Sequence, residues 1–359
     1  MKRSADEDIE SYLAKLKPII NKRIEKWIPR GYDEKSLEFV LGRPRYKNSV
    51  ETSTKGVTEP IWEFLDRGGK RWRPALMILI AEALGLKGED ILDFAIIPEV
   101  VHNGSLVVDD IEDNSDMRRG KPSLHKIFGV DIAINAGNTM YFLPLLVLLK
   151  NSKLASDKVR KLYDVVVQEM ISVSFGQAID IVWHKGGGDS ERISEEQYLQ
   201  MCAYKTGAPV RMSAKMGAIL AGATAEQTES VAEFAETIGV AFQIQDDILN
   251  ILAGDKWGKE FGEDIKEGKH TLLVIHTLQK ASDADRKKLL EILRMHTNDR
   301  ALLEAAVAII KKYGSLEYAK DYARNMVKNS WERMDKVLPD SSSKETLRSF
   351  ANFLVERDL

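Results

Sequence analysis

The stretch GVDIAINAGNTMYFLPLLVLL, residues 129–149, is apolar on almost every side when it is drawn as a helix. A helix that is apolar all round is buried among other elements. The longest continuous apolar part runs from Met140 to Leu149, about half of the roughly 20 residues that a membrane-spanning helix needs. We therefore expect helices packed together, with no transmembrane segment and with membrane contact only at the surface.

Apolar residues recur at helical spacing along nearly the whole chain, and the period-2 alternation of strands is missing. The spacing predicts an opening helix from Ile9 that ends before the turn at 29–31, and a buried helix from Pro74. The segment 43–60 is expected to be a loop or a few broken turns, and the segment 184–193 is expected to be a glycine-rich, flexible loop with no assigned role. Further helices are expected over about 90–114, 123–150, 154–183, 195–222, 225–253, 271–282, 285–296, 299–313, 315–336 and 343–357. We expect an all-α fold without a sheet.

The composition excludes several classes of protein. Of the 359 residues 44% are hydrophobic and 30% are charged, which excludes a disordered, collagenous or disulfide-framework chain. The net charge of −3 predicts no general field for polyanions, and so no nucleic-acid partner. The single cysteine, Cys202, excludes an internal disulfide and fits a reducing compartment. The first residues lack the apolar run of a secretory signal, so we expect a cytoplasmic protein.

Two acidic clusters follow apolar helical runs. Asp109 and Asp113 are four residues apart, which places them on one helix face, and Asp246 and Asn250 repeat this spacing. Alone, either cluster is typical of a solvated helix end. Together they favour two helices that face each other across a cavity, with divalent cations held by carboxylate oxygens and by substrate phosphates.

Basic residues stand where they could complement those carboxylates. The stretch GGKRWRP, residues 68–74, precedes a helix, and the N-terminus of a helix favours a phosphate. His102 lies two helical turns before Asp109, on nearly the same face. By themselves, a basic turn and a lone histidine are more often structural than functional. Further cations are Arg118, Arg119, Lys205, Lys259 and Lys269, the last two in a glycine-punctuated segment at 257–269 that we expect to be a mobile loop.

These motifs form a set with a fixed order: 68–74, His102, 109–113 with Arg118 and Arg119, 176–180, Lys205-Thr206, FQIQDD at 242–247, and Gly268-Lys269. The set resembles the trans-isoprenyl diphosphate synthases, the polyprenyl synthetase family, and is most similar to geranylgeranyl diphosphate synthases. The resemblance covers about residues 66–280. It implies one domain over 1–359, an isoprenoid synthase bundle around a central cavity, and a homodimer.

The resemblance also implies roles for single residues. Those implied to hold the diphosphate of isopentenyl diphosphate are Lys70, Arg73, His102 and Arg119. Those implied to hold the allylic diphosphate or to lie beside the reacting carbon are Arg118, Lys205, Thr206, Gln243, Lys259 and Lys269. The implied Mg²⁺ ligands are Asp109, Asp113 and Asp246, which with Lys205 form the catalytic set.

The reaction that follows is an electrophilic alkylation, in which a diphosphate leaves, an allylic cation forms in a dry site, and isopentenyl diphosphate attacks it. Product length becomes a steric question. Gly104 and Ser105 are small and lie one turn before the first acidic cluster, so we expect passage beyond fifteen carbons. Tyr141 and Phe142 could form a floor, although ordinary packing explains them equally well, and the small Ser174 weakens that floor. Geranylgeranyl diphosphate is the expected product, with twenty-five carbons or more as the alternative.

One departure and two rivals remain. Asn250 stands where many members of the family carry a third aspartate, so the second cluster depends on Asp246 and Asp247. A non-catalytic subunit of a hetero-oligomeric synthase would usually lack some of the aspartates or cations that are present here. A terpene cyclase would not need the set of Lys70, Arg73 and His102.

Overall fold

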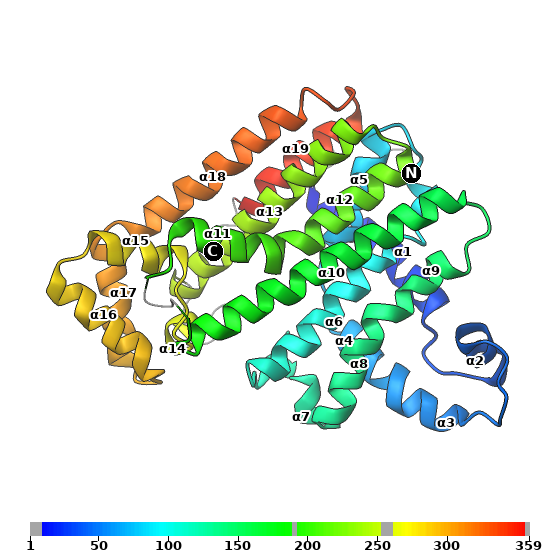
Figure 1. Ribbon diagram of the computed structural model, residues 1–359, viewed down its shortest axis with the longest axis horizontal. Coiled ribbons are helices and arrows are strands. Elements are labelled where there is room, and N and C mark those ends of the chain that lie inside the picture. The colour runs from blue at the N-terminus through cyan, green and yellow to red at the C-terminus, as the bar shows by residue number, and fades with distance from the viewer. Residues whose placement is uncertain (1–8, 189–191, 253–260, 356–359) are drawn as a thin grey trace. The chain divides into compact units, whose positions relative to one another are not determined.

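The structure is a computed structural model that describes residues 9–188, 192–252 and 261–355. These residues fold almost entirely into helices (Figure 1), which confirms the all-α fold class. The helices group into two compact units. Unit 1 comprises residues 1–165, 216–223 and 340–346, and unit 2 comprises 166–215, 224–339 and 347–359. The expected single domain over 1–359 stays a prediction.

Unit 1 carries the N-terminal helices and a short strand pair. Its elements are α1 (Ile9–Trp27), α2 (Glu34–Leu41), α3 (Val50–Ser53), η1 (Thr54–Thr58), α4 (Glu59–Leu65), α5 (Trp72–Ala83), η2 (Gly88–Ile91), α6 (Ile96–Glu112), β1 (Met117–Arg118), β2 (Lys121–Pro122), α7 (Leu124–Phe128), α8 (Val130–Phe142), η3 (Leu143–Leu145) and α9 (Leu146–Leu149).

Unit 2 holds the longer helices of the second half of the chain. Its elements are α10 (Ser156–His184), α11 (Glu195–Cys202), η5 (Ala203–Gly207), α12 (Ala208–Ala221), α13 (Ala225–Leu252), α14 (Glu263–Lys266), α15 (Leu272–Lys280), α16 (Asp283–Met295), α17 (Arg300–Lys312), α18 (Ser315–Met334) and α19 (Ser342–Val355). The first turns of α10 and α19 and the end of α12 belong to unit 1.

Helix boundaries follow the capping residues of the sequence. At the start of α11, the Ser194 side chain accepts a hydrogen bond from the backbone of Gln197, whose side chain accepts one from Ser194 in return. The Thr271 side chain accepts a hydrogen bond from the backbone N–H of Val274 at the start of α15. The Asp299 side chain accepts one from the backbone N–H of Ala301 at the start of α17. Such caps satisfy free N–H groups of the first turn and so favour a helix start at these residues. From residue 154 onward, the outer ends of the expected helical segments are confirmed to within a few residues.

Two expectations about local structure were wrong. The expected helix over 123–150 is broken at Gly129, whose φ of 88° suits glycine, and again near Pro144. The segment 43–60, expected to be a loop or a few broken turns, contains the short elements α3 and η1 and the start of α4, which fits that expectation. A two-stranded antiparallel pair, Met117–Arg118 with Lys121–Pro122, occurs where no sheet was expected. It closes a tight turn at Gly120 and positions two arginines of the candidate site.

Close packing of α6 against α8 depends on two glycines. A side chain at Gly104 would lie 2.8 Å from Cβ of Met140 and 2.9 Å from the carbonyl oxygen of Gly137. A side chain at Gly137 would in turn lie 2.8 Å from Cγ2 of Val108. Neither position has room for a larger residue, so these glycines let the two helix backbones approach.

Two helical stretches of the described chain are long and apolar enough, by length and composition alone, to cross a membrane. The stretch Val130–Leu149 has a mean hydropathy of 1.6 and is half buried, and Ser156–His184 has a mean hydropathy of 1.4 and is 28% buried. Core helices of folded proteins pass the same test, and the first stretch is packed against α6.

Candidate active site

A positively charged cluster forms in unit 1 where the chain turns into α5. Gly68 and Gly69 have φ values of 97° and 119°, and Arg71 follows in the left-handed region, with a φ of 55°. Arg71 is buried and donates hydrogen bonds from Nη1 to Oε1 of Glu99 (2.8 Å) and from Nη2 to the carbonyl oxygen of Leu65 (3.0 Å). Arg71 therefore holds this turn in a conformation that non-glycine residues rarely adopt.

Arg119 reaches the same turn from the β1–β2 hairpin. Its Nη1 donates to the carbonyl oxygen of Gly68 (2.7 Å), and its φ of 53° is also left-handed. A side chain at Gly69 would lie 3.4 Å from Nη1 of Arg71 and 3.5 Å from Nη2 of Arg119. Both guanidinium groups thus lie close to the place that a side chain at Gly69 would occupy, and the glycine leaves that place free for a ligand.

Arg73 and His102 complete the cluster. Arg73 is 5% exposed and its buried Nε has no hydrogen-bond partner within the described structure. Burial lowers the pKa of the Arg73 guanidinium to about 10, with Glu99 opposing and Arg119 adding to the shift. Burial, followed by the charges of Arg73 and Arg119, lowers the pKa of His102 well below its ordinary value, although the ring keeps some surface accessibility. A buried donor without an acceptor, among like charges, suits an anion.

The first acidic cluster lies at the C-terminal end of α6. Asn114, with a φ of 50°, ends the helix directly after Asp113. The carboxylates therefore stand at the negative end of the helix dipole, which is unfavourable without a compensating cation. Arg118 compensates, since its Nη2 lies 3.2 Å from Oδ2 of Asp109 and 2.5 Å from Oδ1 of the buried Asp110.

Asp110 differs from its neighbours. Its side chain is fully buried, whereas that of Asp109 is 20% exposed and Asp113 is half-buried. Burial raises the pKa of Asp110, and the charge of Arg118 opposes this shift. The structure thus leaves Asp109 and Asp113, one turn apart on an accessible face, as the two carboxylates that could bind a cation.

In unit 2, Lys205 and Thr206 lie in the π-helical turn η5, which two neighbouring helices approach very closely. A side chain at Gly176 of α10 would lie 2.3 Å from the backbone nitrogen of Lys205. A side chain at Gly239 of α13 would lie 2.6 Å from Cα of Gly207. π-Helical turns are rare and are often found at functional sites. The two glycines fix this turn between α10 and α13.

The side chains of η5 are held by partners from those two helices. Nζ of Lys205 lies 2.6 Å from Oδ2 of Asp180, and Oγ1 of Thr206 donates to Oε1 of Gln243 (2.8 Å). Burial is the largest single influence on Asp180 and raises its pKa, but the charges of Lys205 and Lys269 and the hydrogen bond from Lys205 together outweigh burial and lower the pKa of that carboxyl. The predicted residues Lys205, Thr206 and Gln243 are therefore brought together in unit 2.

The second acidic cluster places its residues differently from the first. Asp246 is half-buried, whereas Asp247 is buried and accepts hydrogen bonds from Tyr198 and Gln243. Burial raises the pKa of Asp247, while the hydrogen bond from Tyr198 opposes that shift. Asn250 accepts a bond from the backbone N–H of Asp264 (3.1 Å), so it anchors the start of α14. This contact gives Asn250 a structural role at the position where many members of the family carry a carboxylate.

The remaining predicted residues can be placed briefly. Lys70 is exposed, and Lys269 lies next to Asp264 and forms an ion pair with Glu267. Lys259 lies outside the described residues. Asp246 belongs to unit 2 and Asp109 to unit 1, so the expected opposition of the two acidic helices stays a prediction.

The residues expected to set product length have unequal surroundings. Gly104 is occupied with the packing of α8, and Ser105 beside it donates to the carbonyl oxygen of His102 (2.8 Å). Tyr141 is half-buried near Asp109, and burial raises the pKa of Tyr141 to about 12. Phe142 is 70% exposed, and Ser174 is exposed with its hydroxyl bonded to the carbonyl oxygen of Met170.

Metal binding needs ligands from more than one source. Within the described residues, no three side chains of His, Cys, Asp or Glu gather closely enough to hold an ion by themselves. Mg²⁺ is commonly bound by one or two carboxylates together with substrate phosphates and water. The accessible oxygens of Asp109 and Asp113 fit that pattern.

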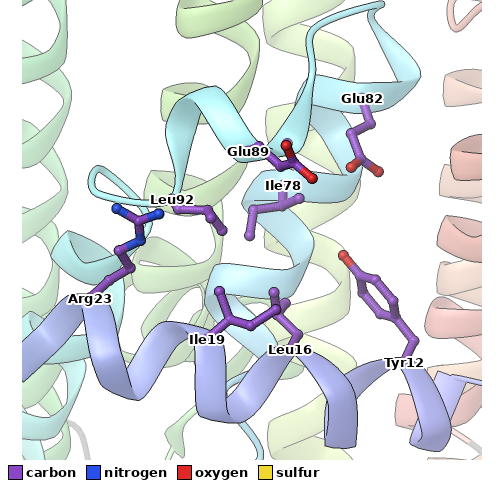
Figure 2. A pocket seen from close by; sticks show the side chains of 9 residues that line it. Tyr12, Leu16, Ile19, Arg23, Ile78, Glu82, Glu89 and Leu92 are labelled. Carbon is purple, nitrogen blue, oxygen red and sulfur yellow. The ribbon is translucent and has the colours of Figure 1, made fainter. Parts of the chain in front are cut away.

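A separate cavity of about 210 Å³ lies in unit 1 between α1, α5 and η2. Figure 2 shows the side chains of Leu16 and Ile19 facing those of Ile78 and Leu92, with Glu82 at the side. None of the predicted site residues lines this cavity.

Several residues of the site were missed by sequence reasoning. Arg71 and Asp180 stand inside the quoted motifs but received no role, and Tyr198 and Glu99 were not noticed. A signal existed for Asp180, since it shares a helix face with Gly176. No local signal marks Tyr198, whose partner Asp247 is 49 residues away in sequence.

Comparison with known proteins gives a consistent result. The sequence model of the polyprenyl synthetase family matches residues 54–310. A short chain isoprenyl diphosphate synthase of Methanothermobacter thermautotrophicus is 36% identical over 81% of this chain and 87% of its own length. A geranylfarnesyl diphosphate synthase of Natronomonas pharaonis is 31% identical over 99% of both chains. The crystal structure of geranylgeranyl pyrophosphate synthetase from Pyrococcus horikoshii is similar with a TM-score of 0.83, at 30% identity over 97% of this chain and 99% of that one.

Proposed function

The chain belongs to the polyprenyl synthetase family and is a prenyltransferase, and we propose that it condenses isopentenyl diphosphate with allylic diphosphates to make geranylgeranyl diphosphate. The observation that carries the proposal is the cluster around Gly69. It combines Arg71 and Arg119 with Arg73, whose buried donor lacks a partner, and with a neutral His102. Such a cluster suits the diphosphate of a second substrate.

The reaction forms one C–C bond and breaks one C–O bond. The allylic C–O bond breaks, the double bond of isopentenyl diphosphate attacks the resulting cation, and a proton leaves to the released diphosphate. The cluster around Gly69 holds isopentenyl diphosphate, and Lys205 binds the departing diphosphate. The hydroxyl of Thr206 and the amide carbonyl of Gln243 present their negative ends to the allylic carbon, which favours the developing cation.

We propose Mg²⁺ as the metal, bound by Asp109, Asp113 and Asp246. When bound, the ion neutralises charge on the departing diphosphate and so favours ionisation of the allylic substrate. Arg118 forms an ion pair with Asp109 in the structure, and it would turn to the diphosphate as the metal takes the carboxylate.

A twenty-carbon product is supported by the small residue at Ser105, which is half-buried one turn before Asp109. A twenty-five-carbon product is the second candidate, because the relative from Natronomonas pharaonis is named a geranylfarnesyl diphosphate synthase. Ser105→Phe should shorten the product, and Ser152→Phe, at an exposed position in the loop between α9 and α10, serves as the matched control. An unchanged product distribution in Ser105→Phe would remove the steric argument.

We propose a homodimer in the cytoplasm without a membrane span. Supporting this, α10 carries an exposed apolar stripe at helical spacing that includes Val167, Ile171 and Phe175, which are 54%, 48% and 65% exposed. Exposed apolar surface of this kind marks an interaction site. A second copy of the chain would cover it.

Incubation with radiolabelled isopentenyl diphosphate tests the function. Dimethylallyl, geranyl and farnesyl diphosphates are offered in turn, with and without Mg²⁺, and the dephosphorylated products are separated by chromatography. We expect Mg²⁺-dependent incorporation with each starter and a twenty-carbon main product. Absence of incorporation with all three starters would contradict the proposal, and a longer main product would favour the second candidate.

A further inference from the structure

We propose that Tyr198 is a positioning residue for the condensation: through Asp247 it fixes which end of the Gln243 amide is presented to Thr206 and the reacting carbon. The inference rests on the proposed function and deepens it. Tyr198 does not touch substrate in this account and acts only through its partners.

The four side chains form a continuous hydrogen-bonded chain within unit 2. The hydroxyl of Tyr198 donates to Oδ2 of Asp247 at 2.6 Å. Oδ1 of the same carboxyl accepts from Nε2 of Gln243 at 2.9 Å, and Oε1 of Gln243 accepts from Thr206 at 2.8 Å. Three elements thus contribute: α11 supplies Tyr198, α13 supplies Gln243 and Asp247, and η5 supplies Thr206 (Figure 1).

The tyrosine end of this chain is rigid. Tyr198 is 2% exposed and Asp247 is 4% exposed, whereas Thr206 and Gln243 at the other end are half-buried. The buried Cys202, one turn after Tyr198 on α11, lies against the same hydroxyl. Packing therefore fixes the hydroxyl of Tyr198. Through Asp247 this fixed hydroxyl restricts the orientation of the half-buried Gln243 and Thr206.

The direction of each bond follows from the chemistry of the groups. Both oxygens of Asp247 act as acceptors in the structure, and an amide has one accepting and one donating end. With Oδ2 of Asp247 occupied by Tyr198, Oδ1 is turned toward Gln243 and takes its amide N–H. The carbonyl oxygen of Gln243 is then directed to Thr206.

This orientation matters for a reaction that develops positive charge. A carbonyl oxygen has two lone pairs, so Oε1 of Gln243 can accept from Thr206 and still face an allylic cation. A reversed amide would present N–H groups, the positive end of the dipole, to the same carbon. Fixed dipoles are worth most when they need not reorganise at the moment of reaction.

Tyr198→Phe removes one hydroxyl and keeps the ring. Oδ2 of Asp247 then lacks its donor, the carboxylate turns to share the remaining N–H, and Gln243 loses its fixed orientation. We expect kcat to fall by at least tenfold while KM for both substrates stays within twofold, because diphosphate binding does not involve this chain of bonds. The matched control is Tyr318→Phe, which removes a hydroxyl bonded to Glu195 (2.7 Å) in the same unit and should leave kcat unchanged.

A double-mutant cycle separates positioning from a general structural effect. In a Gln243→Ala background, Tyr198→Phe should lower kcat by less than twofold further, because its route to the reacting carbon is gone. Losses that multiply would overturn the inference, as would an unchanged kcat in Tyr198→Phe alone. Thermal unfolding of each variant shows whether it is folded under assay conditions.

If Tyr198→Phe does not fold, Asp247→Asn, which keeps the size of the side chain, tests the same link, and we expect it to lower kcat and to be non-additive with Gln243→Ala. Additive losses there would overturn the inference. An inactive wild-type protein would overturn the proposed function and this inference with it. An active wild type with an unaffected Tyr198→Phe would overturn the inference alone.

Discussion

Neighbouring carboxylates at the end of α6 have different tasks because their burial differs. Asp110 is buried against Arg118, whereas Asp113 is accessible and sits at the end of the helix. A buried charged group that loses its partner destabilises the fold, while an accessible one can be removed at little cost to stability. Activity and stability should therefore separate between residues three positions apart.

Asp113→Asn should lower kcat by about 10²-fold, because it removes the negative charge of one proposed Mg²⁺ ligand. The unfolding temperature should stay unchanged. Asp110→Asn should instead lower the free energy of unfolding by about 1–3 kcal/mol, because Arg118 loses a buried partner. Glu112→Gln, an exposed position between them, is the control and should change neither quantity. Activity assays and urea unfolding of the three variants measure this, and equal effects of all three would contradict it.

His102 predicts a pH dependence of stability. Burial and the charges of Arg73, Arg119, Arg118 and Arg71 hold its pKa well below the ordinary value of 6.5. Below that pH the unfolded chain binds a proton that the folded one refuses, so the free energy of unfolding falls as the pH falls.

The comparison variant is His102→Gln, which cannot titrate. Between pH 7.5 and 5.5 the wild type should lose up to about 1 kcal/mol more than the variant. Urea unfolding at both values measures the difference. Equal pH slopes of the two proteins would mean that His102 is not held neutral.

At the residue scale, the sequence was enough to predict the charged and polar side chains of the site but not the residues that bond to them. Arg73, His102, Lys205 and Gln243 stand in motifs that a single sequence displays. Tyr198 became visible only through the fold, because the pairing of α11 with α13 is a tertiary contact.

Among the elements, η5 depends most on its neighbours. Gly176 and Gly239 allow α10 and α13 to approach its backbone on two sides, and Lys205 and Thr206 are carried in that turn. No periodicity distinguishes a π-helical turn from an α-helix, so the sequence predicted one continuous helix over 195–222. The break at Gly129 was missed for a related reason, since packing overrides local propensity.

Gly176→Ala tests the importance of that approach. The added methyl group would lie 2.3 Å from the nitrogen of Lys205, so η5 must shift. We expect a loss of about 1–3 kcal/mol in the free energy of unfolding and a clear fall in kcat.

Gly56→Ala is its matched control, because Gly56 lies in the other π-helical turn, η1, with nothing within 4 Å of the added group. It should be neutral or slightly stabilising. If both variants behaved alike, the close approach of α10 would not be what positions η5. Urea unfolding and steady-state kinetics of the pair decide the matter.

At the scale of the whole molecule, composition and periodicity were enough to predict an all-α protein. The hydrophobic residues, 44% of the chain, recur at helical spacing, and the period-2 alternation of strands is missing. The interleaving of two units could not be predicted, because residues 216–223 and 340–346 join unit 1 through contacts distant in sequence. The proposed homodimer is the next level of organisation, and the exposed apolar stripe on α10 is the observation that supports it.

Ile171→Glu places a charge in the middle of that stripe, where a second copy of the chain would bury it at a cost of several kcal/mol. Sedimentation velocity should show two associated chains for the wild type and one for the variant. Met295→Glu is the control, because Met295 is 59% exposed but no other large apolar residue of α16 (Asp283–Met295) is exposed beside it. A wild type that sediments as one chain, or a Met295 variant that also dissociates, would show that the α10 stripe is not the contact between copies. An exposed apolar stripe of this kind otherwise promotes aggregation. A second copy of the chain that covers it is therefore the simplest explanation for the stripe.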